Sequence, residues 1–473
     1  MALYVLLENW REASERKWLL VASFLSAIVL LIPFGEGLSV EGQRMLALLV
    51  FFVVTFITEA LPVGASFPLV LAWVVFFDVK PPAEAIASIA HDAALFMMGA
   101  LMIARVLVHR NLHQRALAIV LQVLPRKVIL LTAGLATFAA LSSAIISDHT
   151  VAALLLPAAA TLVVASGGIT ENPRMAKFLM ISIAFSCAIG GLATPSGGSR
   201  NVVMMAYLED IAGQSISYQM WASMALPITL LLIPAAVLVP YFMFKPEITD
   251  MEEISENLLE DMDYTGPMDR NDWLTLGIFV LVLVGWITIG TTYGIGLLAI
   301  TGAFAYIVVG LADWERDYQH INWGIVWLYF AAVSFGRALQ ASGAALWLAE
   351  RAMQAITALG LGEGLGLAAA SGTVMMLFSQ TMSDGPAVAL LGPVFLESAQ
   401  ITGTSTTLVG VAAAIASSFA FMLIIGTPSN AIIYSSGYVE ARDFLRAGFW
   451  MALISILVLI IVAGLWWPIL GIT

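Results

Sequence analysis

Long apolar stretches recur along the whole chain and are separated by short polar segments. A transmembrane helix needs about 20 predominantly apolar residues, and the pattern predicts roughly eleven such spans. The predicted spans are 18–35, 44–60, 64–79, 93–109, 176–207, 218–243, 273–291, 294–312, 321–342, 404–437 and 446–468. The chain is therefore predicted to be an all-α polytopic membrane protein.

Two further apolar segments, 128–165 and 366–400, are too long for one helix and carry polar residues at their centres. Non-helical backbone at membrane depth is tolerated only where it is buried in protein or faces water. We therefore expect each segment to be a re-entrant hairpin that enters and leaves on one side of the membrane. The spans 176–207 and 404–437 follow the hairpins, and a break rich in Gly and Pro is expected to interrupt each of them.

The centres of the two hairpins carry nearly the same motif. Ser147 and Asp148 recur as Ser383 and Asp384, and each pair is followed by an Ala-Leu-Leu core and a proline. The repeat predicts four parts of the chain, which are an N-terminal segment with the first span (1–43), a first repeat (44–244), an acidic cytoplasmic linker (245–272) and a second repeat (273–473). An odd number of spans turns the second repeat upside down, so the hairpin tips are expected to meet near the membrane midplane.

Composition and charge agree with a membrane protein, because 60% of residues are hydrophobic and only 11% are charged. The net charge of −12 is concentrated in the acidic linker, which we expect to be solvated. The single cysteine, Cys187, excludes an internal disulfide. The opening residues 1–17 do not resemble a cleavable signal peptide. The distribution of Lys and Arg predicts a prokaryotic inner-membrane protein with a cytoplasmic N-terminus and an external C-terminus.

The repeated motif supplies oxygen ligands within the membrane. An ionisable residue inside a span costs roughly 2.5–3.5 kcal/mol, so two at matching positions indicate an ion or substrate site. Ser143 and Ser379 lie four residues before the repeated serines, on the same face of a helical arm. Oxygen ligands of this kind suit Na⁺ better than a transition metal. The alternative is that each Ser-Asp pair only caps a helix.

Two ionisable residues occur only in the first repeat. Arg200, in the first break, could bind an anionic substrate or neutralise Asp148. His149 could bind substrate, shuttle protons or pack as a neutral polar residue.

These motifs resemble the divalent anion/sodium symporter family, which carries dicarboxylates, citrate or sulfate. The likeness covers nearly the whole chain and includes a Thr-Glu-Ala-Leu-Pro segment at 58–62 and a Gly-Thr-Pro-Ser-Asn-Ala break at 426–431. The resemblance implies a homodimer in which a transport domain moves as an elevator against a scaffold domain. It implies two sodium sites, with ligands from Ser143, Ser147, Asp148, Gly197, Gly198, Ser379, Ser383, Asp384 and Gly426. The substrate is expected between the tips, at Ser147, Asp148, His149, Arg200, Asn201, Ser383, Asp384, Gly385, Thr427 and Asn430.

The chain departs from the family at the tips. The family motif Ser-Asn-Thr has become Ser-Asp-His in the first hairpin and Ser-Asp-Gly in the second. The site is therefore up to two charges more negative, and Arg200 restores one positive charge. Two unit charges about 4 Å apart interact with about 4 kcal/mol at an effective dielectric constant near 20, so these changes should alter specificity. A smaller or less charged anion, such as a monocarboxylate, a sulfonate or an acid that bears an amino group, becomes the favoured substrate.

We therefore predict a cation-coupled secondary transporter for a small anion such as a carboxylate, a sulfonate or sulfate. Na⁺ is the favoured coupling ion, and protons are the alternative. The protein is expected to lie in a lipid bilayer. Neither enzyme activity nor a nucleic-acid partner is expected. A sodium–proton antiporter using Asp148 and Asp384 is the second hypothesis. A hydrolase using Ser147 and His149 is disfavoured, because residues two apart on a helix do not face each other.

Overall fold

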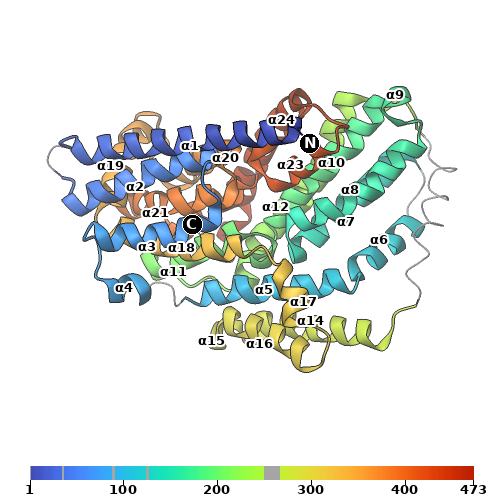
Figure 1. Ribbon diagram of the computed structural model, residues 1–473, viewed down its shortest axis with the longest axis horizontal. Coiled ribbons are helices and arrows are strands. Elements are labelled where there is room, and N and C mark those ends of the chain that lie inside the picture. Colours follow the sequence, from blue (N-terminus) through green and yellow to red (C-terminus); the bar gives the residue numbers. More distant parts are fainter. Residues whose placement is uncertain (1, 35–36, 88–90, 124–126, 250–266, 473) are drawn as a thin grey trace.

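The computed structural model describes residues 2–34, 37–87, 91–123, 127–249 and 267–472, and within these ranges the regular structure is entirely helical. Nine of the described helices are long and apolar enough to span a membrane. They lie side by side in an elongated bundle (Figure 1). The prediction of an all-α polytopic membrane protein is therefore confirmed.

A first group of helices contains most of the unbroken predicted spans. It consists of α1 (Ala2–Leu31), α2 (Val40–Ile57), η1 (Val63–Ala65), α3 (Ser66–Phe76), α5 (Asp92–His109), α14 (Arg270–Thr288), α16 (Ile295–Val308) and α18 (Trp323–Ala341). Within it α1 packs on α2, α3 on α18, and α5 on α16, which also contacts α14. In Figure 1, α14 and α16 form the lower edge of the molecule.

Both predicted hairpins are present as pairs of helices joined at the repeated serine. The first consists of α7 (Val128–Ile146) and α8 (Asp148–Ala165), and the second of α20 (Gly364–Met382) and α21 (Asp384–Thr402). In Figure 1, α7 and α8 lie toward the right of the molecule, whereas α20 and α21 lie toward the left. The two hairpins thus approach the centre from opposite ends.

Both predicted breaks are present as well. The first interrupted span is α10 (Pro173–Gly191), the single turn η2 (Pro195–Gly197) and α11 (Ser199–Ala212), and the second is α22 (Thr406–Ser417), η5 (Ile424–Gly426) and α23 (Pro428–Ser435). Two unbroken helices, α12 (Tyr218–Phe244) and α24 (Ala441–Leu465), pack against each other beside them. Pro195 and Pro428 each begin a new helical turn, where the missing N–H of proline has no cost.

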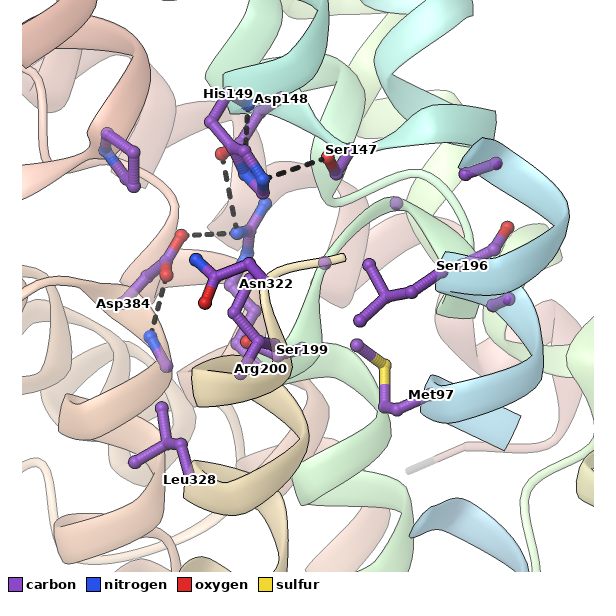
Figure 2. Close-up of a pocket in the computed structure, with 18 of the residues that line it drawn as sticks. Met97, Ser147, Asp148, His149, Ser196, Ser199, Arg200, Asn322, Leu328 and Asp384 are labelled. Carbon is purple, nitrogen blue, oxygen red and sulfur yellow. Dashed lines mark hydrogen bonds and ion pairs between the residues drawn. The ribbon is translucent and has the colours of Figure 1, made fainter. Parts of the chain in front are cut away.

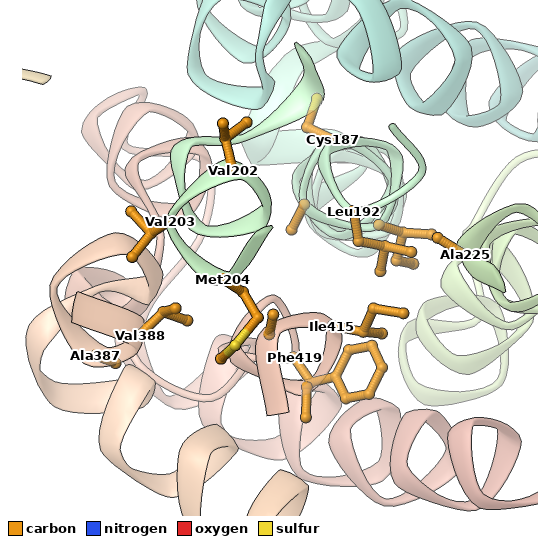
Figure 3. Packing of buried hydrophobic residues seen from close by; sticks show 14 of the residues in the cluster. Cys187, Leu192, Val202, Val203, Met204, Ala225, Ala387, Val388, Ile415 and Phe419 are labelled. Carbon is orange, nitrogen blue, oxygen red and sulfur yellow. The ribbon is translucent and has the colours of Figure 1, made fainter. Parts of the chain in front are cut away.

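The hairpins and breaks of the two halves pack reciprocally. Helix α8 packs on α23 of the other half, and α21 packs on α11. Figure 3 shows Val203 and Met204 of α11 beside Val388 of α21, all within one buried apolar cluster. An inverted repeat would produce this packing, and on this basis we retain the division at the linker as a proposal. Most of the linker lies outside the described residues.

The structure corrects several boundaries and adds short helices. Helix α1 begins well before the predicted span at 18–35, and the predicted spans 64–79 and 294–312 form shorter helices, α3 and α16. The short elements that the apolar pattern did not predict are α4 (Pro82–Ala87), α6 (Leu112–Val123), α9 (Gly168–Glu171), α15 (Gly290–Tyr293), α17 (Trp314–Asp317), η4 (Tyr318–His320), α19 (Ala344–Ala358) and η6 (Trp467–Leu470). They escaped prediction because they are amphipathic or too short to give an apolar stretch.

Candidate functional site

A cavity of about 250 Å³ lies where the two hairpin tips meet the first break. Figure 2 shows the tip residues of the two halves facing each other across it. Of the predicted site residues, those that line the cavity are Ser147, Asp148, His149, Gly197, Gly198, Arg200, Ser383, Asp384 and Gly385. The structure therefore brings together both tips and the charged residue of the first break.

The two tip serines have an unusual backbone conformation. Ser147 has φ 91° and ψ 145°, and Ser383 has φ 68° and ψ 159°. This region is normally occupied by glycine, and a residue with a side chain is held there at a cost of about 1–3 kcal/mol. Such strain is concentrated at functional sites, so its occurrence at both tips supports a function there.

Each aspartate begins the helix that follows its tip. Asp148 Oδ1 accepts a hydrogen bond from the His149 amide at 2.7 Å, and Asp384 Oδ1 accepts one from the Gly385 amide at 2.6 Å. The serines occupy the N-cap positions, but neither side chain makes a capping hydrogen bond. Both side chains are buried, with 5% and 7% of Asp148 and Asp384 exposed.

Arg200 lies between the two carboxylates. Its Nη1 atom forms an ion pair with Asp384 Oδ2 and lies 3.8 Å from Asp148 Oδ2, and only 2% of the residue is exposed. A Cβ atom at Gly191 would lie 2.6 Å from Nη2, and one at Gly198 would lie 2.8 Å from Nη1. These two glycines therefore make room for the guanidinium. Arg200 approaches Asp148, as the sequence allowed. Its ion pair with Asp384, from the other half, was not predicted.

His149 contacts both of its neighbours at the first tip. Its Nε2 atom lies 3.5 Å from Ser147 Oγ, and its Nδ1 atom lies 3.4 Å from Asp148 Oδ1. The argument that Ser147 and His149 cannot meet was wrong, because Ser147 lies in the turn and not in the helix. Ser147 Oγ also lies 3.0 Å from Thr150 Oγ1, so the hydroxyl is held within a small polar network.

Three residues that were predicted to bind substrate lie outside the cavity lining. The Asn201 side-chain amide donates to the carbonyls of residues ten and seven positions earlier, at 2.9 and 2.7 Å. Asn430 makes the equivalent two bonds at 3.0 and 3.2 Å, and Thr427 Oγ1 accepts from its backbone amide. The structure thus uses these residues to hold the two breaks. Of the predicted metal ligands, Ser143, Ser379 and Gly426 also lie outside the lining.

Several lining residues were not predicted. Asn322, at the start of α18, projects toward the tips, and Ser196 and Ser199 come from the first break (Figure 2). Met97 of α5 and Leu328 of α18 supply apolar surface. A polar residue at the start of a span was a weak signal for Asn322, whereas nothing in the apolar pattern separates Met97 or Leu328 from ordinary core residues.

A second hollow adjoins the first. It is lined by residues of α5, α6 and α8, including Val108, Gln114 and Thr150, and shares Ile146 and His149 with the cavity. The second hollow therefore extends the site toward the end of α5 at which α6 begins.

Comparison with known proteins gives matches over almost the whole chain. Residues 14–473 match the family model described as the sodium:sulfate symporter transmembrane region. A sodium-dependent dicarboxylate transporter of Staphylococcus saprophyticus is 24% identical over 484 residues, covering 96% of this chain and 92% of that protein. A protein of the same description from Staphylococcus aureus is 23% identical, covering 95% and 91%.

Two solved structures share the fold. The Alcanivorax borkumensis YdaH transporter has a TM-score of 0.57 at 14% identity and covers 97% of this chain and 98% of its own. Neisseria gonorrhoeae MtrF, described as illuminating a class of antimetabolite efflux pumps, also has a TM-score of 0.57, at 10% identity, with coverage of 84% and 85%. At these identities the likeness concerns the fold alone.

Proposed function

The chain belongs to the family of the sodium:sulfate symporter transmembrane region, and from this premise we propose that it is a Na⁺-coupled secondary transporter of a small anion. Members of this family are transporters and not enzymes, so the contacts among Ser147, His149 and Asp148 are assigned to transport. The observation that carries the proposal is the buried Arg200 side chain, held between carboxylates from both hairpin tips beside a cavity of about 250 Å³.

The charges at the site determine the order of binding. Asp148 and Asp384 contribute two negative charges and Arg200 one positive charge, so with a neutral His149 the site is negative before any ligand enters. An anion therefore binds favourably only after a cation has arrived. The His149 and Gly385 amides already donate to the two aspartates, and the positive ends of the α8 and α21 helix dipoles then favour the anion at the tips.

The same charges limit the substrate. A dianion would meet the two carboxylates of the tips, and an effective dielectric constant near 20 makes each such contact at about 4 Å cost about 4 kcal/mol. A monocarboxylate or a sulfonate with one charge meets half of that repulsion and fits the small cavity. We therefore propose a monoanion in place of the dicarboxylate named for the Staphylococcus relatives.

Transport would follow an elevator mechanism in a homodimer. The hairpins, the broken helices, α12 and α24 would form the transport domain, and the first group of helices would form the scaffold. The support for this division is the packing, because the broken helices contact the hairpins of both halves while α5, α14 and α16 contact one another. The cytoplasmic N-terminus and external C-terminus remain part of the proposal.

The test is uptake of labelled small anions into proteoliposomes, with and without an inward Na⁺ gradient, at equal pH on both sides. Accumulation of a monoanion that requires Na⁺ is the expected result. Na⁺ entry with alkalinisation of the lumen and no anion uptake would instead support a sodium–proton antiporter and refute the proposal. Uptake that follows an imposed pH gradient and ignores Na⁺ would reassign the coupling ion to the proton.

A further inference from the structure

The two halves of the site offer unequal places for a cation. We propose that the transporter takes up a single Na⁺, at the first hairpin, because the Arg200 guanidinium is the resident cation of the second. This inference rests on the proposed function and names the number and place of its coupling ions.

The equivalence of the two halves is visible in their hydrogen bonds. The Asn201 and Asn430 side chains each donate to carbonyls ten and seven residues earlier in the chain. The two tips likewise share the positive φ angle at serine and the bond from the next backbone amide to the aspartate. Because the two halves share this backbone geometry, residues at equivalent positions can be compared directly as ligands for a cation.

The two carboxylates differ in what they still lack. Asp384 is satisfied at both oxygens, by the Gly385 amide at Oδ1 and by Arg200 at Oδ2. Asp148 Oδ2 is buried and has no hydrogen-bond partner among the residues that the structure describes. The Arg200 Nη1 atom lies 3.8 Å from it, which is too distant for a hydrogen bond, and a buried carboxylate oxygen that accepts no hydrogen bond is rare and calls for a ligand.

Ser143 and Ser379, the serines four residues before each tip, are both fully buried but differ in their hydrogen bonds. Ser379 Oγ donates to the Met376 carbonyl at 2.9 Å, whereas Ser143 Oγ makes no hydrogen bond to an oxygen or nitrogen atom within the described ranges. The Cys187 thiol of α10, a weak hydrogen-bonding group, lies beside Ser143 and near Asp148, so these residues belong to one locality. At these two pairs of matched positions, the oxygen that lacks a hydrogen bond is the one in the first half.

The breaks differ as well. In the second half, the Gln380 side chain donates to the Phe419 carbonyl and accepts from the Met422 amide, both at 2.9 Å. Its counterpart, 236 residues earlier in the chain, is Ala144, which has no polar side chain. A Cβ atom on Gly197 would lie 2.7 Å from the Gly191 carbonyl oxygen and 3.0 Å from that of Ser143, whereas one on the matched Gly426 would meet only the Ala420 carbonyl oxygen, at 2.9 Å, among its three nearest atoms. One more backbone oxygen therefore lies close beside the first break.

A hard monovalent cation matches what the first half offers. Carboxylate, hydroxyl and carbonyl oxygens are the ligands that such ions prefer. At the second tip Arg200 Nη1 is in direct contact with Asp384 Oδ2 and occupies the place that a Na⁺ would need, whereas at the first tip it stays 3.8 Å from Asp148 Oδ2 and leaves that oxygen open. One Na⁺ then balances the negative charge that the ion pair leaves on Asp148.

The number of sites is tested by equilibrium binding of radioactive Na⁺ to the purified full-length protein. We expect one Na⁺ per protomer in the wild type and in Arg200→Lys, which keeps the charge. Arg200→Ser copies Ser429 at the equivalent place of the second break, and we expect it to bind two. Two Na⁺ per wild-type protomer, or no Na⁺ at all, would overturn the inference.

The place of the site is tested with the two equivalent serines. Ser143→Ala should raise the Kd for Na⁺ about tenfold, as expected for the loss of a group at an ion site, and the rise for Ser379→Ala should be several times smaller. Equal effects would refute the assignment to the first half. The comparison of these two serine variants locates the Na⁺ site even if Arg200→Ser does not fold. Because binding is measured without transport, a protein that binds one Na⁺ and carries no anion would refute only the proposed function.

Discussion

Arg200 is the residue on which the site depends, because a buried guanidinium is stable only with partners. Removing an ion from water costs several kcal/mol, and close opposite charges must offset that cost. Asp384 and Asp148 supply these charges from two hairpins, while Gly191 and Gly198 leave the space. A larger residue at either glycine would displace the guanidinium from both carboxylates.

Removing the charge of Arg200 should destabilise the protein. In Arg200→Ser the two buried carboxylates face each other without a cation, and loss of one partner of a buried ion pair costs about 3–5 kcal/mol. We expect a clear fall in Tm in detergent without Na⁺, and a recovery of much of it in the double variant with Asp384→Asn. If the double variant were as unstable as the single one, the pairing with Asp384 would not be the cause.

Neutralising Asp384 should change the substrate range. Asp384→Asn releases the guanidinium and removes one negative charge from the site, so a dicarboxylate should meet about 4 kcal/mol less repulsion for a contact near 4 Å. We expect its KM in the uptake assay to fall by about tenfold or more. Asp78→Asn is the matched control, because Asp78 is exposed and its φ of 49° suits asparagine. An unchanged preference for monoanions in Asp384→Asn would contradict the role of charge in selection.

At the scale of the elements, the hairpins and breaks could be predicted because their signals are local. Ser-Asp pairs within apolar segments, and Gly and Pro within spans, mark places where helical hydrogen bonds end. The amphipathic helices α6 and α19 could not be predicted from apolar length. Their positions depend on packing against neighbouring helices, such as α21 beside α19.

The site was only partly predictable for a different reason. The tips were identified because the motif occurs twice, but the pairing of Arg200 with Asp384 joins residues 184 positions apart. Asn322 likewise reaches the tips only through the fold. Asn201 and Asn430 carry the polar groups expected of ligands, and their side-chain N–H groups close the breaks. Sequence spacing does not show whether a polar side chain will face the cavity or form hydrogen bonds that close a break.

The tip conformation gives a prediction for the second hairpin. Ser383→Gly should raise stability by about 1 kcal/mol, because glycine adopts positive φ without strain, and Ser383→Ala should not. Ser371, in the interior of α20, is the control, since glycine there should lower stability by about 1 kcal/mol. Chemical denaturation in detergent would measure both. Similar effects of Ser383→Gly and Ser383→Ala would mean that the backbone at the tip is not strained.

At the scale of the whole molecule, an ion pair joins the broken helix α11 to α18 of the first group of helices. Arg337 of α18 binds Asp210 of α11 through two contacts of 2.7 Å, and His91 Nε2 lies 3.6 Å from the same carboxylate. This cluster lies on the side predicted to be external. The second hollow, lined by Gln114 of α6, lies toward the side predicted to be cytoplasmic. With the orientation proposed above, we infer an inward-facing state from this arrangement.

An elevator movement of α11 against α18 would have to break the contact between Asp210 and Arg337. Asp210→Asn should therefore lower the population of the inward-facing state, and a loss of about 1.4 kcal/mol would change the ratio of states tenfold. The population can be followed through Gln114→Cys in a Cys187→Ser background, labelled in inside-out vesicles with a membrane-impermeant thiol reagent. We expect slower labelling when Asp210→Asn is added, and no such change with Asp78→Asn. An unchanged labelling rate would show that this ion pair stays intact through the cycle, and α11 would then belong with the scaffold.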